Sequence, residues 1–206
     1  MRARHRVHPV ASLQEFFKDS VASAMAKQGV AADDQTAYYV VNLLTLFARH
    51  ESLYSQDQPG PGLQPLASLL AAAADSPSRE SRNALLRRVG DTSLFVAGFL
   101  GDGFARKLVD IDYYIDMGGS AYGQLSDDVR RTREGRVFGS VFAELAVKFR
   151  DFVDVLAEIR DEGKDAAIDV LRLYEVWLKT GSRRAARLLR EQGLEPNATL
   201  NATTRH

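Results

Sequence analysis

The chain has 206 residues, in which 27 Lys and Arg side chains balance 27 Asp and Glu side chains. This length allows one domain with a sizeable core, and the neutral total excludes a global electrostatic attraction to nucleic acid or to an anionic membrane. Because the sequence contains no cysteine, disulfides, thiolate metal sites and a cysteine nucleophile are excluded, and a reducing compartment is favoured. We therefore expect a cytoplasmic protein.

The N-terminal segment, residues 1–11, is predicted to be a flexible basic arm. Its arginines at positions 2, 4 and 6 precede a proline and an amphipathic stretch rather than an apolar run. It therefore lacks the form of a secretory signal. A membrane-spanning helix requires about 18 uninterrupted apolar residues, and the sequence contains no such run. We expect no association with a membrane.

Two helices are predicted near the start of the chain. The first begins at Ser12, whose hydroxyl forms a capping box with Glu15, and it ends at Gly29. The second is capped by Asp33 or Asp34 and runs to about residue 50. The expected buried positions are Leu13, Phe17, Val21 and Ala24 in the first helix and Val40, Leu43, Leu44 and Phe47 in the second.

A loop rich in proline and glycine, residues 55–62, separates that pair of helices from the rest of the chain. Proline and serine start signals then predict one short helix over 65–74 and another over 76–89. Residues 91–100 are ambiguous, because their second half has the apolarity of a buried strand. A single strand has no partner to pair with, so we favour a buried helix ending at Gly101.

The next predicted helix covers residues 110–129 and has a glycine-rich middle. Glycine costs up to about 1 kcal/mol inside a helix, so this helix depends on tertiary packing. Gly119 and Gly123 lie four residues apart, a spacing that lets a second helix approach closely.

The clearest pattern is a heptad seam, in which apolar residues are separated alternately by four and three positions. It predicts one long helix, followed after Gly163 by a second helix of the same spacing that starts at Asp165. The two would form an antiparallel hairpin. The seam residues are Phe138, Phe142, Leu145, Phe149, Phe152, Leu156 and Ile159.

These signals predict an all-α fold, a multi-helix bundle of about eight helices with a long C-terminal antiparallel helical hairpin. Residues 12–193 are expected to form a single domain that ends with a basic helix over 183–192. Residues 194–206 are predicted to be a flexible tail.

Clustered carboxylates are the first candidate site. Asp151, Asp154 and Glu158 follow the i, i+3, i+7 spacing that places them on one helix face, where their oxygens are suitable ligands for Mg²⁺. They also interleave with the apolar seam, so the favoured interpretation is the solvated side of an amphipathic helix. The histidines form no metal-ligand motif, and no cofactor is evident.

A small-ligand site is the second candidate. Tyr113, Tyr114 and Tyr122 could line a pocket on the glycine-rich helix, with Asp112 and Asp116 beside them. Ordinary core packing of half-buried tyrosines is the simpler alternative. An enzyme that uses a small ligand or a divalent metal at these carboxylates therefore stays open.

The final basic helix is the third candidate. Its arginines follow a short turn, Thr180-Gly-Ser182, in the general form of a DNA-binding helix-turn-helix. A neutral chain is a poor electrostatic match for a duplex, so nucleic-acid binding is possible but not favoured. The residues concerned are Arg183, Arg184, Arg187 and Arg190.

The sequence as a whole favours a helical protein-interaction or regulatory module over an enzyme, because catalytic signatures are missing and helix-packing signals are plentiful. A protein partner or self-association is expected. Self-association to a homo-oligomer would follow if one face of the heptad seam were exposed.

Overall fold

The structure is a computed structural model that describes residues 13–54, 65–100, 111–130, 135–162, 176–177 and 180–194. Every regular element in these ranges is a helix, which confirms the predicted all-α fold. The predicted arm (1–11), almost all of the predicted tail (194–206) and most of the expected second arm of the C-terminal hairpin (from residue 165) lie outside the described residues. The elements are α1 (Leu13–Gln28), α2 (Asp34–Tyr54), α3 (Leu66–Ala74), α4 (Arg79–Phe95), the π-helix η1 (Val96–Leu100), α6 (Ile111–Arg130), α7 (Arg136–Val147), α8 (Phe149–Asp161) and α10 (Arg183–Glu191).

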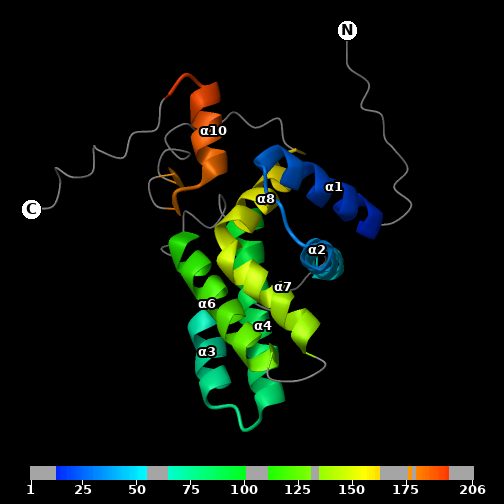
Figure 1. Ribbon diagram of the computed structural model, residues 1–206, viewed down its shortest axis with the longest axis vertical. Helices are drawn as coiled ribbons and strands as arrows, with labels where there is room; N and C mark the ends of the chain where they lie inside the picture. The colour runs from blue at the N-terminus through cyan, green and yellow to red at the C-terminus, as the bar shows by residue number, and fades with distance from the viewer. Residues whose placement is uncertain are drawn as a thin grey trace, which may run out of the picture.

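The helices α4, α6, α7 and α8 form the centre of the bundle, and α6 makes its most extensive contacts with α7 and α4. Figure 1 shows α3 alongside one end of this group, α1 crossing the opposite end, and α10 standing beside α8. No helix of the described ranges combines the length and apolarity needed to cross a bilayer.

Local signals at the helix ends agree with the sequence predictions. Gly29 has a positive φ of 65° and ends α1, because the left-handed conformation at that position costs glycine little. The Asp33 carboxylate accepts from the backbone N–H of Gln35 at 2.9 Å and so caps α2. The predicted start of the following helix at residue 76 is wrong: α4 begins after Ser78, whose hydroxyl oxygen accepts from the Ser81 N–H at 3.1 Å.

Residues 91–100 are helical, as predicted, but they continue α4 instead of forming a separate helix. The α-helix runs through position 89 to Phe95 and then widens into η1. The backbone of η1 lies against α8, because a Cβ added to Gly98 would overlap the side chain of Leu156. Glycine at this position thus allows η1 to pack directly on α8.

The prediction of one helix along the whole heptad seam is wrong. The chain leaves helical geometry at Lys148, where φ is −101° and ψ is 22°, so α7 and α8 are separate helices. The Lys148 ammonium donates to the Ala31 carbonyl oxygen at 2.7 Å. The apolar spacing continues across the break, and for this reason the sequence pattern did not reveal it.

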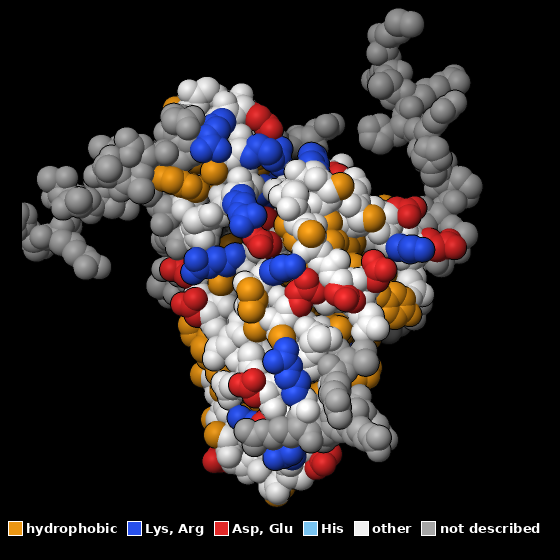
Figure 2. Space-filling model, in the orientation of Figure 1, with side chains coloured by type: hydrophobic (Ala, Val, Ile, Leu, Met, Phe, Trp, Pro, Cys, Tyr) orange, Lys and Arg blue, Asp and Glu red, His pale blue; other side chains and the backbone are white. Residues whose placement is uncertain are grey.

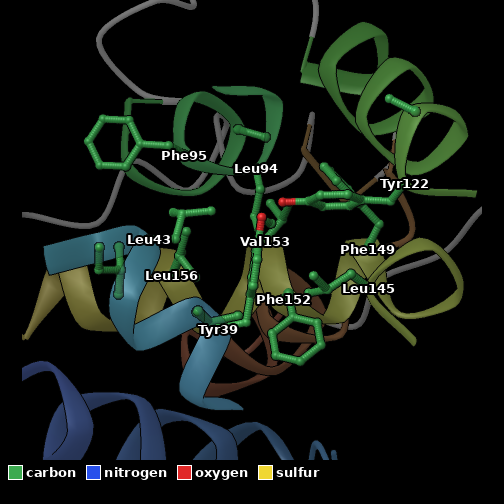
Figure 3. Packing of buried hydrophobic residues seen from close by; sticks show 14 of the residues in the cluster. Tyr39, Leu43, Leu94, Phe95, Tyr122, Leu145, Phe149, Phe152, Val153 and Leu156 are labelled. Atoms are coloured by element: carbon green, nitrogen blue, oxygen red, sulfur yellow. The ribbon is translucent and has the colours of Figure 1, made fainter. Parts of the chain in front are cut away.

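The seam nevertheless supplies much of the core. Six of its seven residues are buried, and Phe138 at the start of α7 is 58% exposed. Tyr122 lies among these rings. The centroid of its ring is 5.8 Å from that of Phe142 and 5.9 Å from that of Phe149. Figure 3 shows this packing around Phe149, Phe152 and Leu156.

Close approach of helices to α6 depends on Gly118 more than on the predicted pair. A Cβ on Gly118 would overlap the Phe149 ring and lie 2.6 Å from the Ser93 Cβ. A Cβ on Gly119 would come no nearer than 3.6 Å to Ala146, and one on Gly123 no nearer than 4.0 Å. The latter two positions therefore make ordinary van der Waals contact with α7.

We expect Gly118→Ala to lower the free energy of unfolding by about 1–3 kcal/mol, because a methyl group there overpacks a buried contact. Gly119→Ala, the adjacent matched control, should leave it unchanged or raise it by up to about 1 kcal/mol through helix propensity. Urea unfolding of both variants makes the comparison. Equal effects at the two positions would contradict the close approach at Gly118.

Candidate functional site

Four carboxylates form a stripe along α8, which we call the acidic stripe: Asp151, Asp154, Glu158 and Asp161. The favoured prediction, that the first three lie on a solvated face, is wrong for two of them. Asp154 is 8% exposed and Glu158 is 5% exposed. Charged groups are buried at this level only when they are paired, and α10 provides many of the partners.

Asp154 receives the N-terminus of α10. The Ser182 hydroxyl donates to Asp154 Oδ1 at 2.6 Å, and the Arg184 backbone N–H donates to Oδ2 at 3.1 Å. The Ser182 oxygen also accepts from the Ala185 N–H at 3.0 Å, so this serine is the N-cap of α10. Burial raises the pKa of the Asp154 carboxyl, and these two donors oppose the rise without cancelling it.

Glu158 is the most heavily bonded carboxylate of the acidic stripe. Its Oε2 accepts from Gln28 Nε2 at 2.7 Å, Arg184 Nε at 3.0 Å and Arg187 Nη2 at 3.0 Å. Its Oε1 pairs with the ammonium of Lys27. Burial by itself would raise the pKa of Glu158, but the bonds from Lys27 and Arg184 outweigh it, and the pKa is lowered.

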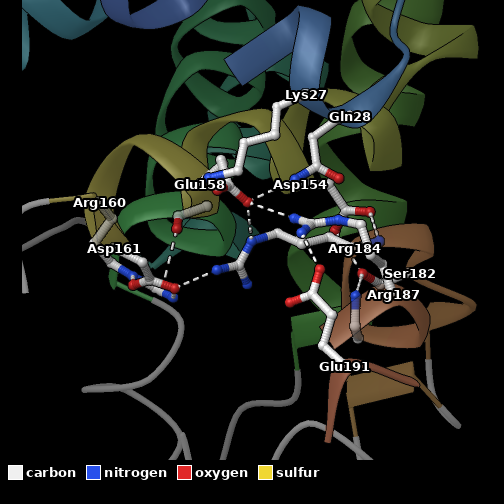
Figure 4. A network of polar contacts seen from close by, with 12 residues as sticks. Lys27, Gln28, Asp154, Glu158, Arg160, Asp161, Ser182, Arg184, Arg187 and Glu191 are labelled. Carbon is white, nitrogen blue, oxygen red and sulfur yellow. Dashed lines mark hydrogen bonds and ion pairs between the residues drawn. The ribbon is translucent and has the colours of Figure 1, made fainter. Parts of the chain in front are cut away.

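The Arg184 guanidinium bridges two turns of α8. Its Nε donates to Glu158, and its Nη2 pairs with Asp161 Oδ2. Asp161 also accepts from Arg160 Nε at 2.7 Å, and together the arginines lower its pKa against the opposing effect of burial. Figure 4 shows these groups converging from α1, α8 and α10.

The remaining arginines of α10 differ in exposure. Arg187 is half-buried and donates to Glu191 at 2.8 Å as well as to Glu158. Arg183 has a 72% exposed side chain whose Nε lies 3.9 Å from Asp151 Oδ1, and Arg190 is exposed. Figure 2 shows Lys and Arg side chains gathered over and around α10, with acidic side chains between them.

Two of the predicted sites are thus partners of each other. The carboxylates proposed for a metal and the arginines proposed for nucleic acid meet at the contact between α8 and α10. One signal in the sequence pointed to this: Arg183 and Arg184 occupy the first helical turn, where the helix dipole disfavours cations unless carboxylates lie nearby.

The other predicted carboxylates do not join the acidic stripe. Asp112 is half-buried with an Oδ1 that has no hydrogen-bond partner, and Asp116 is exposed. Across the described ranges, no group of three or more His, Cys, Asp or Glu side chains is arranged to hold a metal ion.

The three predicted tyrosines occupy two different environments. Tyr113 is exposed and makes an edge contact with the half-buried Tyr114, 5.6 Å between ring centroids. Tyr122 is completely buried, and its hydroxyl donates to Asp91 Oδ1 at 2.7 Å. The three side chains therefore do not line one site.

Tyr122 belongs to a polar group that the sequence analysis missed, which we call the Asp91 cluster: Tyr39, Arg87, Asp91 and Tyr122. The Tyr39 hydroxyl donates to the same Asp91 Oδ1 at 2.6 Å, and Arg87 Nε donates to the Tyr39 oxygen at 2.9 Å. The hydroxyl ends of both tyrosines point toward one place in Figure 3. The cluster joins α2, α4 and α6 through one carboxylate.

Burial raises the pKa of Asp91, and the donors Tyr39 and Tyr122, followed by the charge of Arg87, reduce this rise without cancelling it. Burial and the nearby carboxylate also raise the pKa values of Tyr39 and Tyr122, so both hydroxyls stay protonated donors. No sequence motif brings these residues together, because they come from three helices.

The class that the fold defines is an all-helical bundle. No protein-family model, curated protein or solved structure matches the chain. The main feature of the candidate site is the contact of α10 with the buried carboxylates of α8.

The raised pKa of Asp91 predicts a pH-dependent stability. Between the unfolded pKa, about 3.9, and the higher folded pKa, the native state holds a proton that the unfolded chain has released. The contribution to the free energy of unfolding is therefore complete below the unfolded pKa and is lost as pH rises through the folded pKa. Asp91→Asn removes this pH-dependent contribution, because asparagine does not titrate, while the asparagine amide oxygen can still accept from the two tyrosine hydroxyls.

Urea unfolding from about pH 4 to pH 7 measures this effect as the difference between wild type and Asp91→Asn. We expect wild type to lose stability relative to the variant as pH rises. Tyr39→Phe removes a donor that lowers the Asp91 pKa, so it should extend the loss to higher pH. A difference between wild type and Asp91→Asn that is constant with pH would contradict the assignment.

Proposed function

We propose that the protein is a helical regulatory and interaction module, in which α10 docks reversibly on the acidic stripe of α8. Release of α10 would uncover that stripe for a protein partner. The observation that supports this proposal is the burial of Asp154 and Glu158 against donors that α10 provides.

The composition of the contact favours reversible docking. The buried apolar residues of α10 are Ala185, Ala186 and Leu189, and only the leucine is large, worth about 1.5–3 kcal/mol on full burial. The polar contacts between α10 and α8 are hydrogen bonds and ion pairs to carboxylates. The desolvation of buried charges offsets much of their attraction. Such a contact is specific without being strongly stabilising.

The helix itself also depends on docking. It has nine residues, and isolated helices shorter than about 12–15 residues are marginal in water. Its first turn carries Arg183 and Arg184, which oppose the helix dipole when no carboxylate is near. Undocked α10 should therefore lose its helical structure, so that docking and helix formation form one two-state element.

The alternatives have less support. A metal-dependent enzyme needs the carboxylates of the acidic stripe, and a DNA-binding helix needs the arginines of α10, but these groups satisfy each other. Self-association through the heptad seam would need an exposed seam face, and six of the seven seam residues are buried. A cytoplasmic location remains a proposal that rests on the absence of cysteine.

Amide hydrogen exchange tests the docking. In wild type, we expect the amides of residues 183–191 to exchange faster than those of α4 and α6, because α10 opens without global unfolding. Glu158→Gln weakens two arginine bonds, and charged hydrogen bonds are worth about 1.5–3 kcal/mol. Exchange in α10 should therefore accelerate at least about tenfold, with α6 unchanged.

Glu162→Gln is the matched control, since Glu162 is an exposed glutamate one turn further along the chain. It should leave α10 exchange at the wild-type rate. The proposal would be overturned if the amides of α10 exchanged only through global unfolding. Their exchange rate would then equal that of α6 and would be the same in both variants.

A further inference from the structure

We infer that the acidic stripe accepts, in place of α10, an arginine-bearing amphipathic helix of a partner protein with a serine or threonine N-cap and arginines two and five residues later. This inference rests on the proposed function and adds the chemistry of the partner. The observation that identifies the ligand is α10 itself, which occupies the stripe with Ser182, Arg184 and Arg187 in these positions.

The first requirement is a capped helix N-terminus. Asp154 accepts both the hydroxyl of the capping Ser182 and the N–H of Arg184. A carboxylate at this position interacts favourably with the positive end of the helix dipole. An occupant without the capping hydroxyl would leave Asp154 Oδ1 buried without that donor.

The second requirement is a guanidinium rather than an ammonium. Arg184 reaches Glu158 with Nε and Asp161 with Nη2, and these two carboxylates lie on successive turns of α8. The planar fork of arginine carries donors that diverge in fixed directions, whereas lysine presents a compact charge on a flexible stem. Lysine at this position keeps the charge but loses the bridge.

The third requirement is net positive charge. Among the described residues outside α10, Lys27 and Arg160 are the cations that form ion pairs with the four carboxylates of the acidic stripe. The excess of carboxylates attracts basic segments. Arg187 provides a further hydrogen bond to Glu158 Oε2.

The fourth requirement is small side chains between the two arginines. Ala185 is 1% exposed and Ala186 is 9% exposed, so larger residues at these positions would have to displace neighbouring atoms. Leu189, one turn later, is the large apolar side chain of α10 that is fully buried. The occupant is thus a serine-capped helix with two alanines framed by arginines, followed by leucine.

The experiment uses a fluorescein-labelled peptide with the sequence of residues 180–194 and the full chain. The double variant Arg184→Ala with Arg187→Ala weakens the chain's own docking. It should bind the peptide at least about tenfold more tightly than wild type, where the tethered helix competes at an effective concentration near millimolar. Fluorescence anisotropy gives both dissociation constants.

Peptide variants test the recognition chemistry. Arg184→Lys and Ser182→Ala in the peptide should each weaken binding at least about fivefold, which corresponds to about 1 kcal/mol. Arg183→Lys is the matched control and should bind like the parent, because Arg183 is mostly exposed and lies 3.9 Å from Asp151. Equal binding by all four peptides would overturn the inference and leave reversible docking intact.

Wild-type chain labelled with ¹⁵N provides a measurement that does not depend on a variant. Saturating unlabelled peptide should accelerate amide exchange of the chain's own residues 183–191, because the acidic stripe cannot bind both helices at once. The inference would be overturned if the amide exchange of residues 183–191 did not change and the folded double variant bound no peptide. Protection of α10 in that double variant equal to wild type would instead overturn the proposed function.

Discussion

The arrangement of α1 and α10 on α8 depends on the interactions of the buried Glu158 carboxylate. This carboxylate joins Lys27 and Gln28 of α1 to Arg184 and Arg187 of α10. A charge at this depth is tolerable only when each oxygen has donors, so loss of one partner would affect three helices. The proposed release of α10 follows from the same dependence, because leucine at position 189 is the one large apolar side chain among the buried residues of α10.

Two buried carboxylates, Glu158 of the acidic stripe and Asp91 of the Asp91 cluster, have pKa values that are shifted in opposite directions. Glu158 is surrounded by cations, and its pKa is lowered. Asp91 receives neutral tyrosine hydroxyls and one partly exposed arginine, so burial dominates and its pKa is raised. The Asp91 cluster therefore joins α2, α4 and α6 through a carboxyl group that binds its proton more tightly than usual, whereas Glu158 binds its proton less tightly and is suited to pair with arginine. Asp154 of the acidic stripe shares the raised pKa of Asp91.

Local patterns predicted most helices because the signals are local. The glycine after α1, the aspartate before α2 and the apolar spacing within each helix depend on neighbouring residues alone. The break at Lys148 was missed because the seam continues across it, and its ammonium contacts a carbonyl more than a hundred residues away in sequence. The Asp91 cluster was missed because its members come from three helices.

The sequence by itself determined an all-α chain, its main apolar faces, and the presence of a carboxylate stripe and an arginine helix. Only the tertiary structure decided that these two charged elements face each other. Helical periodicity shows which residues share a face, but it does not show whether that face meets water, a metal or another helix. Asp154 and Glu158 have the spacing of solvated residues, and they are buried because α10 brings Ser182, Arg184 and Arg187 to them.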